Sequence, residues 1–145
     1  MKISCKKLRP DAILPTRGST QAAGYDLYAC LDVPLLTVPP HGTVKVGTGL
    51  AIAVPEGTFG ALFARSGLAS RQGLRPANCV GVCDSDYRGE YIIAIHNDSD
   101  TERVIAPGDR IAQLVILPHM TAEFTETDTL PETERGAGGF GSTGV

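Results

Sequence analysis

The stretch TVKVGTGLAIAV (Thr43–Val54) decides the fold class, because apolar residues alternate along it with small or polar ones. Alternation with a period of two is typical of a β-strand that is buried on one face. Three more stretches share the pattern: TFGALFA (Thr58–Ala64), YIIAIHN (Tyr91–Asn97) and DRIAQLVIL (Asp109–Leu117). Turn signals such as VPEG and APGD separate them at intervals of about ten residues, which favours a closed barrel or jelly roll over an α/β sheet.

One stretch, RSGLASRQG (Arg65–Gly73), predicts a short helix. Ser66 is a suitable N-cap, helix-forming residues follow it, and Gly73 is a suitable stop. The amides at the start of this helix, with Arg65 beside them, are typical of an anion site. On this window alone, an ordinary surface helix is the simpler interpretation.

The composition fits one soluble domain. The 145 residues include 17 glycines and 10 prolines, so short strands joined by turns are expected. No Lys/Arg stripe is present, which argues against binding to a nucleic acid polymer, and no apolar run is long enough to cross a membrane. The N-terminus has no signal-peptide pattern, so we expect a cytoplasmic protein. The four cysteines have no zinc-site spacing and predict reduced thiols.

The character of the chain changes after Pro118. Residues 120–134 are polar, acidic and β-branched without periodicity, which predicts an extended arm behind a β-barrel domain of residues 1–119. Residues 123–134 alone can span up to about 40 Å. The arm can therefore carry the glycine-rich end, residues 135–145, to a neighbouring subunit.

The densest cluster of chemistry-bearing residues is NCVGVCDSDYRGE (Asn78–Glu90). Asp84 directly follows an apolar run, where a carboxylate is costly unless it has a partner or a task. A surface turn with solvated acids is the alternative interpretation.

Five motifs now occur in a fixed order and together cover nearly the whole chain. They are AAGYDLYA (Ala22–Ala29), ARSGLAS (Ala64–Ser70), NCVGVCDSDYRGE (Asn78–Glu90), GDRIAQLVI (Gly108–Ile116) and RGAGGFGSTG (Arg135–Gly144). This set resembles the five motifs of the trimeric deoxyuridine triphosphatases, or dUTPases. The resemblance implies an all-β, jelly-roll-like barrel that forms a homotrimer. It also implies Mg²⁺-assisted hydrolysis of dUTP to dUMP and diphosphate, which lowers dUTP and supplies dUMP for thymidylate synthesis.

The resemblance implies a role for each residue of the third motif. Asn78 and Val82 belong to a hairpin that binds uracil through its backbone, and Tyr87 packs under the deoxyribose, although it also fits an ordinary core aromatic. Asp84 is implied as the general base that activates water for attack on the α-phosphorus. Cys83 departs from the aliphatic residue expected before that aspartate, which is a mild change.

The second, fourth and first motifs imply the phosphate and metal contacts. Arg65, Ser66 and Gly67 resemble the phosphate-binding segment, and Gln113 resembles the residue that holds water and phosphate. Asp26 resembles the acid that helps to hold Mg²⁺, through waters. The alternative for Gln113 is an outward-facing polar position on a strand. The alternative for Asp26 is an ordinary acid in a turn.

The fifth motif contains five glycines and cannot hold its own shape, because ordering ten such residues costs roughly 10–20 kcal/mol. The resemblance implies a lid that orders on the substrate: Arg135, Ser142 and Thr143 on the phosphates, Phe140 over the base, and Gly141 in close backbone approach. A disordered chain end is the alternative.

Two other functions stay open. One is a dCTP deaminase or bifunctional deaminase–dUTPase with a similar barrel, although such relatives carry a different acid in the corresponding strand. The other is a barrel that binds nucleotide without catalysis.

Overall fold

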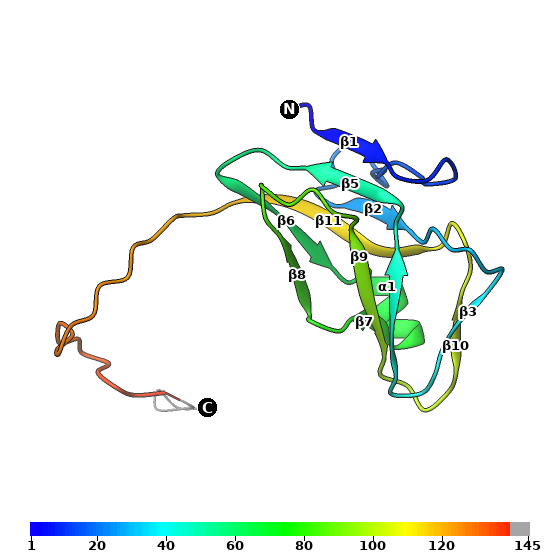
Figure 1. The fold of residues 1–145 in the computed structure, drawn as a ribbon. Helices are drawn as coiled ribbons and strands as arrows, with labels where there is room; N and C mark the ends of the chain where they lie inside the picture. The colour runs from blue at the N-terminus through cyan, green and yellow to red at the C-terminus, as the bar shows by residue number, and fades with distance from the viewer. Residues whose placement is uncertain (140–145) are drawn as a thin grey trace.

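The computed structural model describes residues 1–139, which form β-strands, one helix and an extended arm (Figure 1). The elements are β1 (Ser4–Lys7), β2 (Tyr25–Tyr28), β3 (Leu36–Val38), β4 (Thr43–Gly47), β5 (Leu50–Ala53), β6 (Thr58–Phe63), α1 (Ser66–Gln72), β7 (Leu74–Pro76), β8 (Val80–Cys83), β9 (Ile92–Asn97), β10 (Arg103–Ile105) and β11 (Arg110–Pro118).

The strands pair into four antiparallel sheets. The largest has the order β2-β11-β6-β8, a second has the order β4-β9-β7, and β1-β5 and β10-β3 are two-stranded. The predicted all-β fold with one short helix is confirmed. No strand of one sheet pairs with a strand of another, however, so the described residues do not form a barrel closed by strand pairing.

The core lies between the sheets and is aliphatic. Leu27, Leu50, Ile95 and Ile111 are fully buried, and Tyr91 is the largest buried side chain. In β9 the inward positions alternate with more exposed ones, as the period of two in YIIAIHN predicts. The large sheets are therefore held together mainly by apolar burial.

The stretch Thr43–Val54 is two strands and not one, so the prediction of a continuous strand is wrong at its centre. Gly49 has a φ of 66°, and a Cβ there would lie 2.8 Å from the Ala12 side chain. The buried Thr48 hydroxyl donates to the Tyr91 carbonyl at 2.7 Å, and the Gly49 amide donates to Glu90 Oε1 at 2.7 Å. These contacts turn the chain from β4 into β5.

The predicted helix forms as α1, but its start differs. The N-cap is Arg65, with extended backbone and no side-chain capping bond, so the prediction of Ser66 as N-cap is wrong. The chain enters α1 directly from β6, which places the extended residue one position earlier. The predicted stop is confirmed: Gly73 has a φ of 69° and its amide donates to carbonyls in the last turn.

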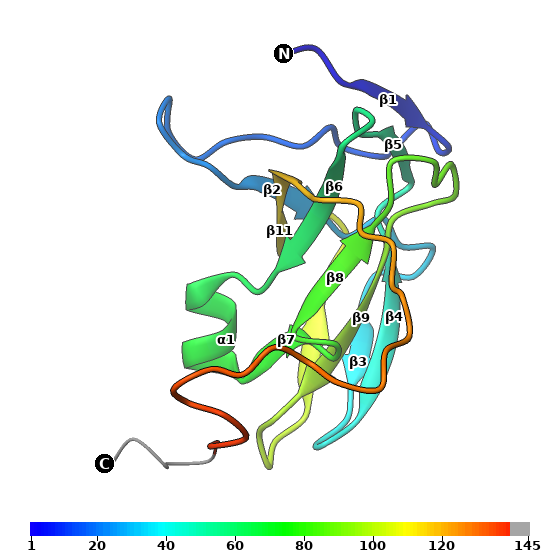
Figure 2. The same cartoon turned by 90° about the vertical axis from the view of Figure 1, so that its left-hand side faces the viewer.

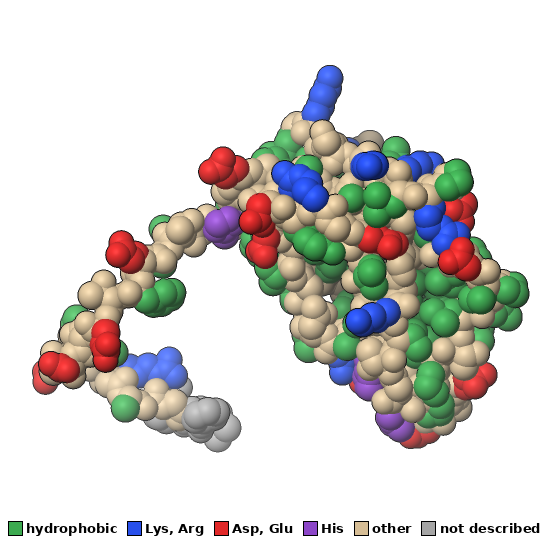
Figure 3. All heavy atoms as spheres, in the orientation of Figure 1, with side chains coloured by type: hydrophobic (Ala, Val, Ile, Leu, Met, Phe, Trp, Pro, Cys, Tyr) green, Lys and Arg blue, Asp and Glu red, His purple; other side chains and the backbone are tan. Residues whose placement is uncertain are grey.

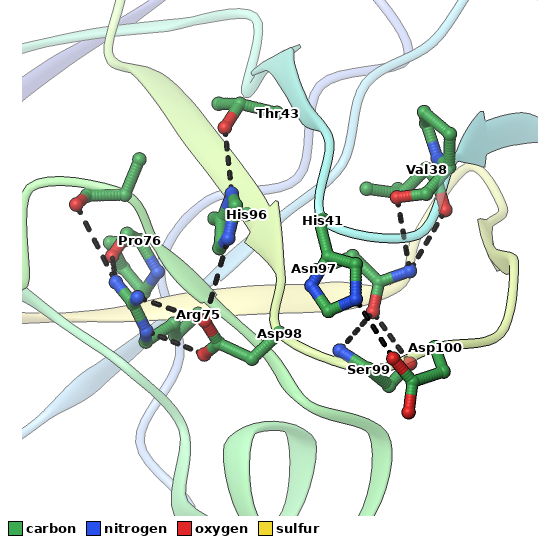
Figure 4. Close-up of polar contacts among 12 residues, drawn as sticks. Val38, His41, Thr43, Arg75, Pro76, His96, Asn97, Asp98, Ser99 and Asp100 are labelled. Atoms are coloured by element: carbon green, nitrogen blue, oxygen red, sulfur yellow. Dashed lines mark hydrogen bonds and ion pairs between the residues drawn. The ribbon is translucent and has the colours of Figure 1, made fainter.

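A polar network closes the turn after β9 (Figure 4). The buried Asn97 amide donates to the carbonyls of Val38 at 3.1 Å and Thr101 at 2.8 Å. Arg75 of β7 donates two hydrogen bonds to Asp98, at 2.6 and 2.9 Å, and these lower the pKa of Asp98. The network fixes β7, β9 and the end of β3 relative to one another.

Beyond β11 the chain forms an arm that extends away from the sheets in Figure 1 and crosses in front of them in the turned view of Figure 2. Acidic side chains are spread along it (Figure 3). Three large apolar side chains on it are almost fully exposed: Met120 at 95%, Phe124 at 96% and Leu130 at 81%. Such exposure is unusual for residues of this kind in a folded chain.

All four cysteines, Cys5, Cys30, Cys79 and Cys83, are free thiols, as predicted. Within residues 1–139, no helix combines the length and the hydrophobicity that a bilayer crossing requires.

Candidate active site

One hollow, of about 240 Å³, lies beside β8 and the turn that follows it. It brings together four residues that the sequence singles out: Asn78, Val82, Asp84 and Tyr87. Its other lining residues are Leu62, Gly81, Cys83, Glu90, Tyr91 and Ile92. We call this the β8 hollow.

Two tyrosines form one wall of the β8 hollow. The Tyr87 hydroxyl donates to the Glu90 carbonyl at 3.0 Å, and its ring centroid lies 6.1 Å from that of the buried Tyr91. Burial raises the pKa of Tyr91, whose hydroxyl has no hydrogen-bonding partner among residues 1–139. The wall is thus an aromatic surface fixed at its base.

Asp84 is exposed and follows the last residue of β8. Its carbonyl accepts a hydrogen bond from the Tyr87 amide at 3.2 Å. Arg88 Nη1 donates to the carbonyls of Ser85 at 2.7 Å and Tyr87 at 2.9 Å, which braces the same turn. The Asp84 carboxylate itself has no hydrogen bond or ion pair within the described part of the chain, so it is available to accept a proton. Burial raises the pKa of the adjacent Cys83 thiol, which therefore stays uncharged.

A second hollow, of about 650 Å³, lies where α1 meets β2 and β11. It brings together Asp26, Arg65, Ser66, Gly67 and Gln113. Its other lining residues are Gly18, Ala22, Ala23, Gly24, Phe63, Arg71 and Val115. We call this the α1 hollow.

Among residues 1–139, Asp26 is the only carboxylate that lines the α1 hollow, and two arginines hold it. Arg65 Nε donates to Oδ1 at 2.7 Å, and Arg110 Nη1 donates to Oδ2 at 3.4 Å. The Asp26 side chain is only 13% exposed and that of Arg65 27% exposed. Both carboxylate oxygens are therefore engaged by guanidinium groups.

Gln113 is fixed by its backbone neighbours. Its Nε2 donates to the Ala64 carbonyl at 2.8 Å, and a Cβ at Gly24 would lie 2.5 Å from its Oε1. Because Gly24 has no side chain, the side-chain amide of Gln113 can pack closely against the backbone of the first motif. Gln113 lines the hollow, and its Oε1 accepts no hydrogen bond among residues 1–139.

Asp84 and Gln113 are far apart within one chain. Asp26, Gln113, Phe63 and Val80 form one row across the largest sheet. Asp84 lies four residues beyond Val80, about 13 Å along β8, and Gln113 lies two strand spacings away, so their Cα atoms are roughly 16 Å apart. Asp84 and Gln113 of one protomer therefore cannot contact the same small group.

The sequence model of the dUTPase family matches residues 10–144, which is nearly the whole chain. The chain belongs to the dUTPase family. It is 51% identical over 148 residues to the deoxyuridine 5'-triphosphate nucleotidohydrolase of Desulfitobacterium hafniense, across 100% of this chain and 97% of that protein. It is 46% identical to the probable deoxyuridine 5'-triphosphate nucleotidohydrolase of Schizosaccharomyces pombe, and each chain is covered completely.

Solved structures of dUTPases share the fold. The dUTPase of Staphylococcus bacteriophage 80alpha with dUPNHPP superposes with a TM-score of 0.89 at 30% identity, over 99% of both chains. A dUTPase mutant from phage phi11 of S. aureus, described as coordinating a structural Mg(II) ion, superposes with a TM-score of 0.80 at 25% identity. That match covers 91% of this chain and 100% of the phage chain.

Residues 135–139, the described part of the fifth dUTPase motif, line neither hollow. Arg135 Nε donates to the Gly138 carbonyl at 2.8 Å, within the same motif. Phe140, Gly141, Ser142 and Thr143 lie outside the described residues, so their predicted roles stay predictions.

Sequence reasoning missed two arginines of the dUTPase site region. Arg110 holds Asp26 from β11, and Arg71 lines the α1 hollow from the last turn of α1. Both stand within or beside quoted motifs. No residue spacing, however, shows that Arg110 reaches across to β2, since that contact depends on the pairing register.

Proposed function

We propose that this chain hydrolyses dUTP to dUMP and diphosphate. The observation that carries the proposal is the β8 hollow, in which an unpaired carboxylate, Asp84, stands at the mouth of a nucleoside-sized recess beside Asn78 and Tyr87. The family membership and the dUTP analogue in the phage 80alpha dUTPase support the same reaction.

The β8 hollow is the proposed nucleoside site. The backbone of β8 near Asn78 and Val82 offers amide and carbonyl groups to the uracil edge, as a pairing strand would. The Tyr87 ring, held by Tyr91 and by the Glu90 carbonyl, provides an apolar surface for the deoxyribose. A 2′-hydroxyl against this surface would lose its hydration without gaining a partner, which favours a deoxynucleoside.

Asp84 acts as the general base in this proposal. It accepts a proton from a water molecule, the water oxygen forms a bond to the α-phosphorus, and the bond from that phosphorus to the bridging oxygen of diphosphate breaks. The brace from Arg88 supports this role, because a base must stay within hydrogen-bonding reach of the attacking water.

The α1 hollow is the proposed phosphate site. Arg65 contributes charge, and Ser66 and Gly67 contribute donors next to it. Gln113 can accept from water through its amide oxygen and donate to phosphate through the second N–H of Nε2, since the first is bound to Ala64. Electrostatic stabilisation of this kind supplies most of the rate in phosphoryl transfer, because there is little covalent chemistry for the protein to do.

Mg²⁺ fits this site through water and not by direct ligation. Asp26 has both oxygens bound by arginines, and residues 1–139 contain no cluster of three His, Cys, Asp or Glu side chains suited to a metal. Each carboxylate oxygen still has a lone pair that can accept from a metal-bound water. Bound with the triphosphate, the ion would neutralise part of its charge.

We propose that the enzyme is a homotrimer in which the two hollows of one site come from different protomers. The separation of about 16 Å between Asp84 and Gln113 supports this arrangement, because a single chain cannot join them. The exposed Met120, Phe124 and Leu130 of the arm also support it, since packing on a neighbour would bury them.

The proposed lid completes the site. Residues 1–119 form the barrel, residues 120–134 form the arm, and residues 135–145 close over the bound nucleotide. Arg135 is free of acidic partners within the described residues and can bind phosphate. Closure would exclude bulk water from the reacting phosphorus.

A substrate panel tests the proposal. The wild-type chain with Mg²⁺ is expected to release diphosphate from dUTP far faster than from dCTP, dTTP or UTP, without ammonia. Asp84→Asn should keep dUTP binding and lose at least about a hundredfold in kcat. Asp86→Asn, in the same turn but outside the hollow, is the matched control and should stay active. Ammonia from dCTP would indicate a deaminase instead, and binding without diphosphate release would indicate a non-enzymatic barrel.

A further inference from the structure

The α1 hollow contains a second guanidinium group besides that of Arg65. Arg71 lines it from the last turn of α1, a helix that Figure 2 shows directly beyond the end of β6. We propose that Arg71 binds the outer two phosphates of the substrate and retains diphosphate after cleavage. The proposal rests on the proposed function and adds a residue to its phosphate site.

The charges in the hollow distinguish the two arginines. Arg65 donates to Asp26 at 2.7 Å, so much of its charge is offset by a partly buried carboxylate. Arg71 forms no ion pair and no side-chain hydrogen bond among residues 1–139. It is the uncompensated cation of the hollow, whereas Arg65 and Asp26 together are close to neutral. A triphosphate carries several negative charges and needs such a group.

The position of Arg71 indicates which phosphates it meets. Gln113 is tied to the Ala64 carbonyl, just before α1 begins, whereas Arg71 lies five residues beyond Ser66, about 7.5 Å along the helix axis. Both side chains line one hollow, Gln113 tied to the chain just before α1 and Arg71 attached near its end. If Gln113 holds the phosphate under attack, the chain of phosphates extends along α1 and brings its outer members to Arg71.

A structural role for Arg71 predicts a different result. A cation in the last turn of a helix stabilises the helix through its dipole. Loss of that effect would lower thermal stability and would weaken all ligands alike. Loss of a contact to the outer phosphates would weaken only those ligands that carry them.

The experiment compares Arg71→Gln and Arg71→Lys with wild type. Lys45→Gln is the control, because it removes one exposed positive charge on β4 that lines neither hollow. Four quantities are measured: the inhibition constants of inorganic diphosphate and of dUMP, the KM for dUTP, and the melting temperature.

Arg71→Gln is expected to raise the inhibition constant of diphosphate at least roughly tenfold and to raise the KM for dUTP. The constant for dUMP should change less than about twofold, and Arg71→Lys should restore part of the loss because it keeps the charge. Lys45→Gln should behave as wild type.

Equal effects on diphosphate and dUMP, or no effect on either, would overturn the role of Arg71 while dUTP hydrolysis by wild type continued. Failure of the wild-type chain to hydrolyse dUTP would instead overturn the proposed function, so the two failures are distinguishable.

Discussion

Arg65 Nε lies 2.7 Å from Asp26 Oδ1, and this ion pair ties the start of α1 to β2. Both side chains are largely buried, so Arg65 without its partner would be a poorly compensated charge. Asp26→Asn keeps the shape but weakens both arginine contacts. We expect it to lower the free energy of unfolding by about 1–3 kcal/mol and to reduce kcat/KM, because Arg65 is no longer held in place.

Urea denaturation and steady-state kinetics check this prediction. Asp100→Asn is the matched control, since Asp100 is 96% exposed and pairs only with the exposed His41. The control should change the free energy of unfolding by less than about 0.5 kcal/mol. A stability loss for Asp26→Asn no larger than that of the control would mean that the pair does not anchor α1.

Gly49 and Gly57 provide a second matched pair, because both have positive φ angles, 66° and 75°. At Gly49 a Cβ would lie 2.8 Å from Ala12 Cβ and 2.9 Å from Cys30 Sγ, whereas at Gly57 nothing lies within 4 Å. Gly57→Ala should therefore cost about 1 kcal/mol from the backbone alone, and Gly49→Ala about 2–4 kcal/mol from backbone and overpacking together. Chemical denaturation of both variants measures the difference, and equal losses would contradict it.

Strands that are long and regularly alternating were predicted well from the sequence. β6, β9 and β11 occur within one or two residues of their expected bounds because the period of two extends over six or more residues. β7 and β8 have only three and four residues, too few for any period to be read. The break at Gly49 was also missed, since the apolar pattern continues across it unchanged.

Prediction of the candidate site from the sequence was limited in a similar way. The motifs identified Asp26, Gln113 and Asp84 individually, but the row that joins Asp26 to Gln113 is a property of strand register. The same register separates Asp84 from Gln113, which no linear spacing reveals. Arg110 was missed for this reason, because its contact with Asp26 spans 84 positions in the sequence.

Low pH should weaken the ion pair between Arg75 of β7 and Asp98 in the turn after β9. The hydrogen bonds from Arg75 lower the pKa of Asp98 in the folded state, with His96 contributing from the same side. A carboxyl with a lowered folded-state pKa stabilises the fold above its ordinary pKa, near pH 4, and this contribution is lost as the pH falls through the folded-state value.

The measurement is the urea midpoint of wild type and Asp98→Asn at pH 7 and near pH 2.5. The difference between the urea midpoints of the two proteins should be largest at pH 7 and smaller near pH 2.5. Glu56→Gln, at an exposed turn position without an ion pair in the described residues, should show no such narrowing. A gap that is independent of pH would rule out the ionic contribution.

Removal of the proposed lid should separate catalysis from stability. A chain ending at Glu134 is expected to melt within about 2 °C of wild type, because the side-chain hydrogen bond of Arg135, to Gly138, lies within the deleted segment. Its kcat/KM for dUTP should fall by a hundredfold or more, at roughly 10²–10³ for each lost transition-state donor. Deletion of Val145 alone is the control. Undiminished hydrolysis by the chain ending at Glu134 would exclude a lid.

Complementation between inactive variants tests whether each site combines two protomers. Asp84→Asn removes the base from the β8 hollow, and Arg65→Gln removes one of the two arginines that line the α1 hollow. Each homotrimer should be nearly inactive. When equal amounts are unfolded together and refolded, a site is intact only where the β8 hollow comes from an Arg65→Gln chain and the α1 hollow from an Asp84→Asn chain. With random assembly each of these two conditions is met with a probability of one half, so about a quarter of wild-type activity should return.

The complementation result depends on the separation of Asp84 from Gln113 and on nothing else about the mechanism. If the two hollows of one protomer served the same substrate, every site in a mixed trimer would carry one defect and no activity would return. Asp84→Asn refolded alone under the same protocol gives the background activity. Light scattering on the refolded sample gives the assembly mass, and a monomer with full wild-type activity would exclude a shared site directly.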